Sequence, residues 1–367
     1  MLSLASIASE KDSLTSIWSN KKEADSTRFL AFKDLIFNHY TYSDADSSIL
    51  LADSMRKDAA SLKLTRWEGE ALNVLGISYY IAGNLEKAME SYEGALQKYV
   101  SINYNRGQAS VLTNMANIFD DLGNAKKALE LYAQALEKEE ESNKLGLAYT
   151  TMNIGVIYFG QGMIEKAMDK YAESLSILKE IDHQQGVAVV LNNLAASYRE
   201  LGQNDTAMSL FYESLKLREK LGDNYGVSRC LDNIAETQIR NAEFEEAFSA
   251  INRSLLIKQE IGYAHGVAKS LGDLSMAYHG LGQEDQALFY VDSAFRMSQN
   301  LGHVDLIRDI ASYAYLIYKE TGDFKQGLKM HELKVQMTDS LTDKKLQEDL
   351  AKQEARFQFE KAQLIKE

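Results

Sequence analysis

The chain has 367 residues, no proline, 45% hydrophobic and 25% charged residues, a composition typical of a globular or repetitive protein and not of a disordered one. Its net charge of −13 repels phosphate backbones and anionic lipids, so nucleic acid and membrane surfaces are not expected partners. The single cysteine, Cys230, excludes an internal disulfide framework, and no run of about 18 apolar residues is present to span a bilayer.

The N-terminal residues 1–65 predict a capping helix followed by a degenerate helical hairpin. The stretch DSLTSIW predicts a short helix whose Trp18 covers an exposed apolar end. Residues 24–62 keep helical spacing, with Ser48 at a position that a small residue takes in each later unit. Atypical end units of this kind cap repeat arrays.

Seven similar units are predicted over residues 66–340. A glycine lies five residues before most of their central small residues and an aromatic residue nine before, as Gly83 and Tyr79 do for Ala88. A fixed period near 40 residues indicates stacked helical hairpins, in which the small residue lets two helices approach closely. The central residues, at intervals of 39 or 40 residues, are Ala88, Ala128, Ala167, Ala207, Ala247, Ala287 and Gly327.

The pattern NxLGxxYxxxGxxxxAxxxYxxAL in the first clear unit resembles the tetratricopeptide repeat; it is carried by Gly76, Tyr79, Ala88, Tyr92 and Ala95. The resemblance implies an all-α fold: a right-handed α-α superhelix of about eight helical hairpins plus a long C-terminal helix. The units are about six residues longer than the common 34-residue form. In place of the usual proline between repeats stand Gly107, Gly146, Gly186, Gly226 and Gly266.

Residues 341–367 predict an amphipathic linker helix that leaves the array, with Leu346, Leu350, Phe357 and Leu364 on a broken apolar stripe. Three of these residues recur every seven positions, a spacing that suits a homodimer through this helix. This tail, with DSTRFLAFKDL near the start and the recurring GVAxxLxNLA, resembles the periplasmic sensor region of bacterial membrane-bound signalling proteins. In such proteins a histidine kinase, nucleotide cyclase or DNA-binding output domain follows a membrane span.

The first helix of each tetratricopeptide hairpin is expected to line a concave groove. Carboxamides spaced one repeat apart both donate and accept hydrogen bonds, so they can hold an extended peptide backbone. Cations are expected toward the C-terminal half of the groove and aromatic side chains, including Tyr80, toward the N-terminal half. The predicted groove residues are Asn114, Asn117, Asn153, Asn192, Asn193, Asn233, Asp273, Arg199, Arg229, Arg240, Lys269, Tyr149 and Phe159.

A second interpretation of these residues stays open. Asparagine at this position belongs to the repeat pattern itself, so its amide could bond to the neighbouring helix and not to a ligand. The arginines could pair with groove acids such as Asp232, Glu200 and Glu236, because surface charges are usually solvated and internally paired.

No catalytic motif is present: the sequence has no Walker-type loop, no HExxH and no CxxC, and its six histidines are scattered. We therefore expect no catalysis, cofactor or metal in this chain, although a catalytic output domain could follow in a longer protein. The expected function is a peptide-binding or protein-binding module that senses a ligand for a bacterial signal-transduction protein, in the periplasm. The alternative is a cytoplasmic adaptor that assembles protein partners. Beyond the groove ligand and the homodimer, no nucleic acid and no membrane insertion are expected.

Overall fold

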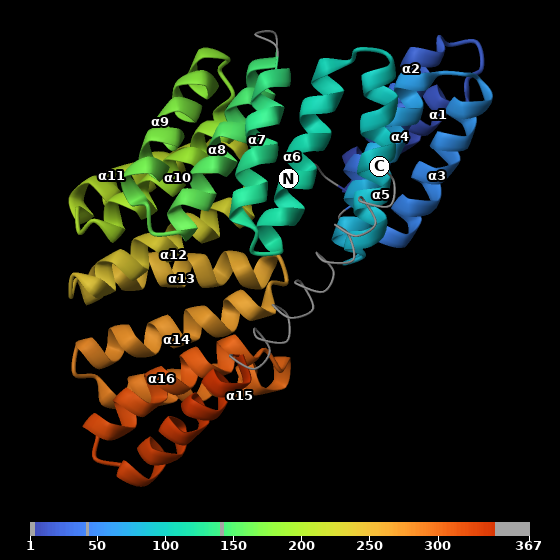
Figure 1. Cartoon of the computed structure of the whole chain (residues 1–367). Helices are drawn as coiled ribbons and strands as arrows, with labels where there is room; N and C mark the ends of the chain where they lie inside the picture. Colours follow the sequence, from blue (N-terminus) through green and yellow to red (C-terminus); the bar gives the residue numbers. More distant parts are fainter. Residues whose placement is uncertain (1–3, 42–43, 140–142, 342–367) are drawn as a thin grey trace. The chain divides into compact units, whose positions relative to one another are not determined.

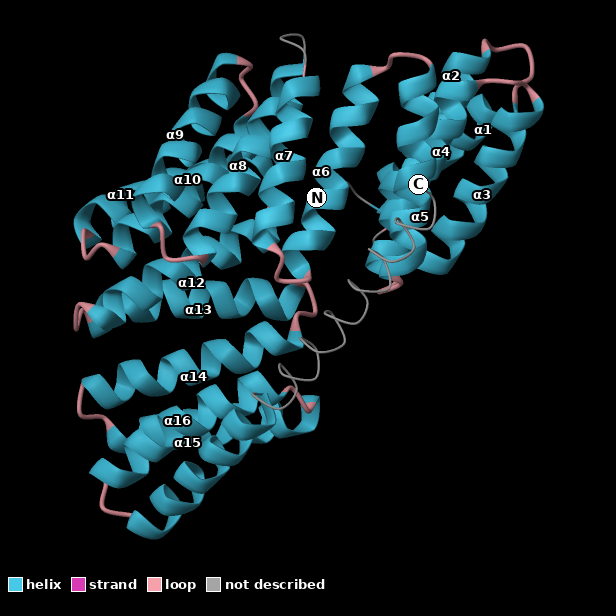
Figure 2. Cartoon of the chain, viewed as in Figure 1, coloured by secondary structure: helices cyan, strands magenta, loops and turns pink. Residues whose placement is uncertain are grey.

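The computed structural model describes residues 4–41, 44–139 and 143–341. These residues form helices joined by short turns, and no strand occurs among them (Figure 2). The predicted all-α class is thereby confirmed. The chain divides into two compact units, Met1–Ile157 and Tyr158–Glu367.

The first unit is a stack of antiparallel helices in which each hairpin packs on the next (Figure 1). Helices of one hairpin follow each other along the chain, and the unit ends within α8. Its helices are α1 (Leu4–Ser19), α2 (Asp25–His39), α3 (Ala45–Ser61), α4 (Thr65–Ile81), α5 (Leu85–Ser101), α6 (Asn105–Asp121), α7 (Ala125–Lys138) and α8 (Lys144–Gly160).

The second unit continues the same pattern, and the last labelled helix is followed by a helical segment over residues 324–341. Its helices are α9 (Ile164–Glu180), α10 (Gln184–Glu200), α11 (Asn204–Leu221), α12 (Asn224–Arg240), α13 (Phe244–Glu260), α14 (Ala264–Gly280), α15 (Glu284–Leu301) and α16 (Val304–Glu320). The predicted linker helix, with the seam of Leu350, Phe357 and Leu364, lies outside the described residues. The predicted division at residues 65 and 340 stays a prediction.

The turn inside each hairpin from α4 onward depends on a left-handed residue. Gly83 has φ +76°, and the glycines at the same place in most other hairpins are also left-handed. The hairpin of α12 and α13 lacks the glycine, and Ala242 takes its place with φ 60°. Because a Cβ makes this conformation unfavourable, glycine is the residue best suited to the turn.

Small residues allow the close packing of the two helices in a hairpin. Ala88, Ala207 and the other repeat alanines have no exposed surface, which confirms their predicted place between the helices. Gly76 in α4 lies directly under the ring of Tyr92, so a Cβ there would overlap the ring. From Ala88 to Ala247, the side chain eleven residues after the alanine lies against the glycine near the start of the next hairpin, as Tyr99 does at Gly107.

The N-terminal helix α1 closes the first core. Its Trp18 stacks on Phe32 with a centroid separation of 4.2 Å and meets Phe29 edge to face at 5.2 Å. The predicted covering role of this tryptophan agrees with these contacts, since aromatic pairs of this geometry add to the free energy of burial.

First helices of successive hairpins also touch one another. In the first unit α4 contacts α2 and α6, and in the second unit α12 contacts α10 and α14, which in turn contacts α16. Each unit therefore has a face made of first helices, here called the first-helix face. The groove residues predicted from the sequence belong to these helices.

Candidate binding face

In the first unit, the predicted asparagines bond to one another across repeats. Asn114 Nδ2 donates to Asn73 Oδ1 at 3.0 Å, and Asn153 Nδ2 donates to Asn117 Oδ1 at 3.4 Å. The hydroxyl of Tyr132 also donates to Asn117. Asn73 was missed by the sequence analysis, although it stands fifteen residues before its alanine, as the predicted Asn192 does.

The predicted aromatic residues are partly buried. Tyr149 in α8 is half-buried, and burial raises the pKa of its hydroxyl. Tyr80 in α4 donates its hydroxyl to the carboxylate of Asp121, so that hydroxyl is already engaged within the first unit. Phe159, near the end of α8, is also half-buried. These positions agree with a mixed apolar and polar surface and do not by themselves select a ligand.

In the second unit, the two adjacent asparagines of α10 have different surroundings. Asn192 is 7% exposed, and its Oδ1 accepts from Asn233 Nδ2 at 3.1 Å and from Cys230 Sγ at 3.7 Å. Asn193 is half-buried, and among the described residues its side chain has no hydrogen-bond partner; only its backbone oxygen accepts, from Ser197 Oγ at 3.0 Å. Asn192 therefore holds two hairpins together, whereas the amide of Asn193 is available.

Two of the four predicted cations are paired within the face. Arg199 Nη1 donates to Glu236 Oε2 at 3.2 Å and to Asn233 Oδ1 at 3.4 Å, which joins α10 to α12. Arg240 Nη2 donates to the other oxygen of Glu236 at 2.7 Å, and its Nη1 lies 3.8 Å from Glu200. The internal pairing considered above as the alternative is what the geometry gives for these two arginines.

The other two cations are exposed. Arg229 in α12 and Lys269 in α14 both stand eighteen residues before their repeat alanine, so they occupy the same place in neighbouring hairpins. Neither has an ion pair within 4 Å among the described side chains. Both lower the pKa of Tyr263, although burial raises it more, so the three side chains share one electrostatic environment. These cations remain available to a ligand.

A buried lysine that the sequence analysis missed lies beneath them. Lys258 in α13 is 1% exposed, and its Nζ donates to Asp232 Oδ1 at 2.7 Å and to Ser270 Oγ at 2.8 Å. Ser254 Oγ donates to the same carboxylate oxygen at 2.6 Å. One signal existed: Lys258 stands eleven residues after its alanine, a place that Leu178 fills with a buried apolar side chain.

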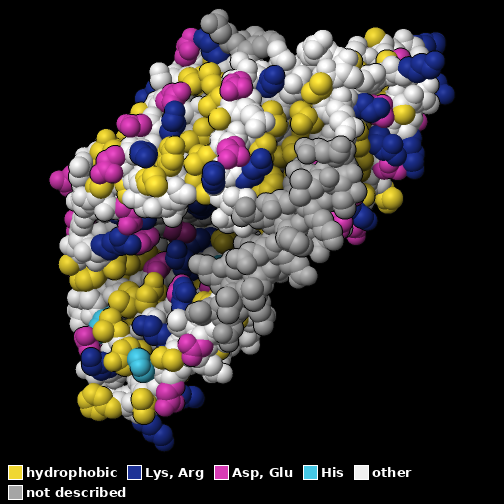
Figure 3. All heavy atoms as spheres, in the orientation of Figure 1, with side chains coloured by type: hydrophobic (Ala, Val, Ile, Leu, Met, Phe, Trp, Pro, Cys, Tyr) yellow, Lys and Arg dark blue, Asp and Glu magenta, His cyan; other side chains and the backbone are white. Residues whose placement is uncertain are grey.

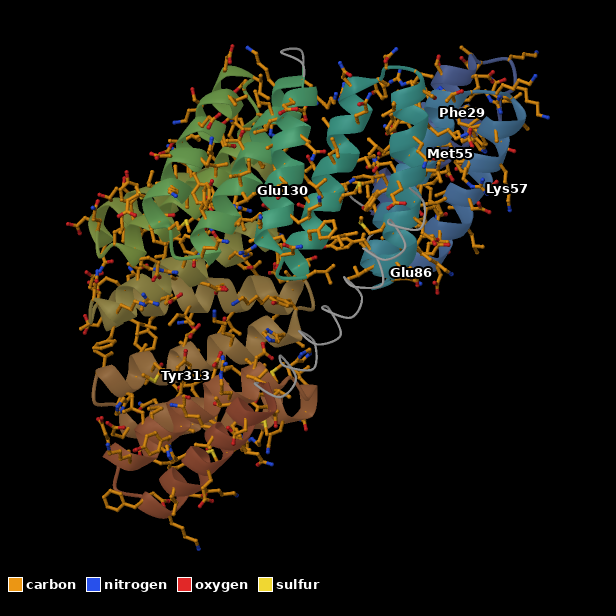
Figure 4. The ribbon with its side chains drawn as sticks, viewed as in Figure 1. Phe29, Met55, Lys57, Glu86, Glu130 and Tyr313 are labelled. Carbon is orange, nitrogen blue, oxygen red and sulfur yellow. The ribbon has the colours of Figure 1, made fainter. Side chains whose placement is uncertain are left out.

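Asp273 in α14 is a half-buried carboxylate without a donor. No described side chain gives it a hydrogen bond or an ion pair within 4 Å. Burial raises the pKa of Asp273 to about 7; Lys269 lowers it, and Asp232 raises it further. Tyr313 from α16, labelled in Figure 4, packs its ring against Gly272 of α14. Burial and then the Asp273 charge raise the pKa of Tyr313.

The histidine near the end of α14 is also engaged. His279 has Nδ1 at 3.1 Å from Glu284 and Nε2 at 3.1 Å from Glu320. Within the described part of the chain, no group of three or more histidine, cysteine, aspartate and glutamate side chains is arranged to hold a metal ion. Figure 3 shows side chains of both charges together over the region of α12 to α14.

The helical hairpins and their first-helix faces define an all-α repeat protein. The tetratricopeptide repeat family model matches residues 67–141, 111–180, 146–220 and 186–259, which together span more than half of the 367 residues. The chain belongs to the tetratricopeptide repeat family. No curated protein is close enough in sequence to count as a relative.

Three solved structures illustrate the shared fold. A signal transduction ATPase with numerous domains and a tetratricopeptide repeat sensor, from Pyrococcus horikoshii, has a TM-score of 0.65 and 15% identity, covering 92% of this chain and 54% of that one. Aspartyl phosphate phosphatase F from Bacillus subtilis has a TM-score of 0.61 and 12% identity, covering 92% and 95%. A Rap protein complexed with competence and sporulation factor has a TM-score of 0.58 and 11% identity, covering 92% and 98%. At these identities the likeness concerns the fold alone.

Proposed function

We propose that the chain is a non-catalytic module that binds a peptide or protein segment on the first-helix face of its second unit. One observation carries the proposal: on a face where most polar groups are paired, Asn193, Arg229, Lys269 and Asp273 have no partner among the described residues. Unpaired donors and acceptors lose water on contact with a ligand, so a complementary chain would satisfy them.

The predicted residues divide into two roles in this proposal. Asn193, Arg229, Lys269 and Asp273 contact the ligand directly. Asn192, Asn233, Arg199 and Arg240 hold α10 and α12 in register and shape the surface between them. In the first unit, Asn114, Asn117 and Asn153 have the same positioning role, with Tyr149 as a partly exposed neighbour.

The biological role that we favour is sensing of a ligand for a bacterial signal-transduction protein, in the periplasm. Its support is the likeness of the chain's start, repeats and tail to membrane-bound sensors. One of the similar folds carries a tetratricopeptide repeat sensor and another was solved with competence and sporulation factor, as their names state. The described helices contain no apolar length sufficient for a membrane span. The alternative, a cytoplasmic adaptor, predicts no signal peptide and no membrane span in the flanking coding sequence.

Binding can be tested with random heptapeptides displayed on phage and selected on the purified chain. Selected peptides are synthesised and titrated calorimetrically against Asn193→Ala and against the double variant Arg229→Ala with Lys269→Ala. Each lost hydrogen bond in a desolvated site should weaken binding by about 1–3 kcal/mol. Helix content should not change, because none of the three side chains bonds to another hairpin.

Matched controls come from second helices. Asn252→Ala on α13 removes an exposed amide, and Lys216→Ala on α11 removes an exposed cation. Both should bind the selected peptides as the unmodified chain does. Equal weakening by the controls, or no weakening by the first-helix variants, would place binding on another surface and remove this proposal.

Self-association is proposed through residues 342–367, whose apolar seam repeats every seven positions. One apolar column over two heptad steps supports only weak pairing, which tethering to a membrane would strengthen by raising the local concentration. Sedimentation of the chain with and without these residues tests it. A tight dimer that survives the deletion would place self-association on the repeats.

A further inference from the structure

Two hairpin boundaries share a contact between the residue fourteen positions before one repeat alanine and the residue fifteen positions before the preceding one. In the first unit, Asn114 at the former position bonds to Asn73 at the latter in the preceding hairpin. In the second unit, Asn233 bonds to Asn192 in the same way. An amide can donate and accept, so two amides satisfy each other across the hairpin boundary.

Between α12 and α14 the same two positions hold Asp232 and Asp273. Both are acceptors only when ionised, so neither can donate to the other. The boundary between α14 and α16 shows the same register. There Gly272 and Tyr313 stand at these two positions, and Tyr313 packs its ring against Gly272. The two carboxylates therefore occupy the positions that hold two bonded amides at the α4 to α6 and α10 to α12 boundaries.

The buried donors serve only one of the two acids. Lys258 Nζ and Ser254 Oγ both donate to Asp232 Oδ1, at 2.7 and 2.6 Å. No described side chain donates to Asp232 Oδ2 or to either oxygen of Asp273. Lys258 thus pairs with Asp232 directly, whereas Lys269 acts on Asp273 only by its charge, without an ion pair within 4 Å. The second carboxylate is half-buried and has no donor among the described side chains, which is a costly arrangement for an ionised group.

We infer that Asp273, together with the open oxygen of Asp232, receives a cationic group of the ligand: an ammonium or a guanidinium presented by a peptide. This inference rests on the proposed function and names the ligand chemistry at that face. A cation supplies the missing donors and the missing positive charge together, and such charge-assisted hydrogen bonds are stronger than neutral ones. The net charge of −13 favours the approach of basic ligands.

The surrounding charges are consistent with this choice. Glu236 is occupied by Arg199 and Arg240, so it does not compete for the ligand cation. Arg229 and Lys269 lie one turn nearer the start of their helices and remain exposed. They would repel a purely basic ligand, so we expect the cation to be followed in the peptide by an acidic or neutral residue.

The test uses glycine pentapeptides capped by acetyl and amide groups, with lysine, arginine, acetyllysine or glutamate in the middle. A fifth probe, pentaglycine amide with a free amino terminus, separates a terminal amine from a side-chain cation. Binding is measured at pH 8 by ligand-detected NMR with the full chain, with Asp273→Asn, and with the exposed-acid control Asp285→Asn. The Asp273→Asn variant is expected to fold, because it restores the amide found in other hairpins.

The lysine or arginine peptide, or the free-amine probe, should bind at least about tenfold more tightly than the acetyllysine and glutamate peptides, which is the effect of one charge-assisted contact. The preference should disappear in Asp273→Asn and persist in Asp285→Asn. Equal binding of charged and acetylated probes, an unchanged preference in Asp273→Asn, or no binding of any cationic probe at millimolar concentration would overturn the inference. Phage-selected peptides that respond to Asn193→Ala but not to Asp273→Asn would leave the proposed function standing and remove the cationic site.

Discussion

Replacing Asp273 by asparagine should make the stability of the chain less dependent on pH. The pKa of Asp273 is raised to about 7 in the folded chain from its ordinary value of 3.8, chiefly by burial. Between these two values the folded chain holds a proton that the unfolded chain has released. The stability contributed by this group is therefore present at low pH and is lost as the pH rises through 7.

The magnitude follows from the shift. About three pKa units correspond to about 4 kcal/mol of unfolding free energy at 1.36 kcal/mol per unit. Proton linkage predicts that about 3 kcal/mol of this free energy is lost between pH 5 and pH 8. Because Asp273 is only half-buried, we expect about 2 kcal/mol in that interval. The Asp273→Asn variant should therefore gain about 2 kcal/mol relative to the unmodified chain on going from pH 5 to pH 8.

Urea unfolding followed by circular dichroism at 222 nm measures this at pH 5, 6, 7 and 8. The quantity compared is the difference in unfolding free energy between the variant and the unmodified chain, since other titrating groups then cancel. Asp285→Asn, on an exposed helix start, should show a difference that is constant across the pH range. A constant difference for Asp273→Asn as well would refute the burial of an unpartnered carboxylate at this place.

Three further predictions concern the packing. Lys258→Met should cost about 3 kcal/mol of unfolding free energy, because it leaves a buried carboxylate without its cation. Adding Asp232→Asn should recover most of this loss, since the pair is then replaced by two uncharged side chains. Urea midpoints measure both variants. Gly76→Ala should lower the free energy of unfolding by about 1–3 kcal/mol through overlap with a buried ring, whereas Gly160→Ala, with open space around it, should raise it by up to about 1 kcal/mol. Deleting residues 185–224 should leave a folded helical protein with less helix in proportion, because each hairpin contacts chiefly its neighbours; a chain unfolded by circular dichroism would contradict this.

The fold was predictable because its constraints are local and repeated. A buried alanine such as Ala207 and a left-handed glycine such as Gly202 stand at fixed places in a period of 39 or 40 residues. Each such place has one steric reason, so the pattern is visible without knowledge of distant contacts. The register of the first-helix face follows from the same count, which is why the predicted groove residues lie on first helices.

The state of each groove side chain was not predictable, because it depends on the residue that the neighbouring hairpin presents. Asn192 and Asn193 are adjacent and identical in type, yet only Asn192 meets an amide donor from the next hairpin. The pairing of Arg199 with Glu236 depends on a partner 37 residues away. Such pairs become visible only when the residue at one repeat position is compared with the residue that it contacts in the next hairpin.

Comparing the residues that meet across each hairpin boundary also explains why the α12 to α14 boundary is distinct. Two amides satisfy each other at the α4 to α6 and α10 to α12 boundaries, whereas Asp232 and Asp273 require donors from elsewhere. The chain supplies a buried lysine for one of them. Hydrophobic replacements of both acids would serve stability better than a half-satisfied polar pair. An acid that lowers stability at this place, on the face that also holds two exposed cations, is better explained by recognition of a ligand than by packing.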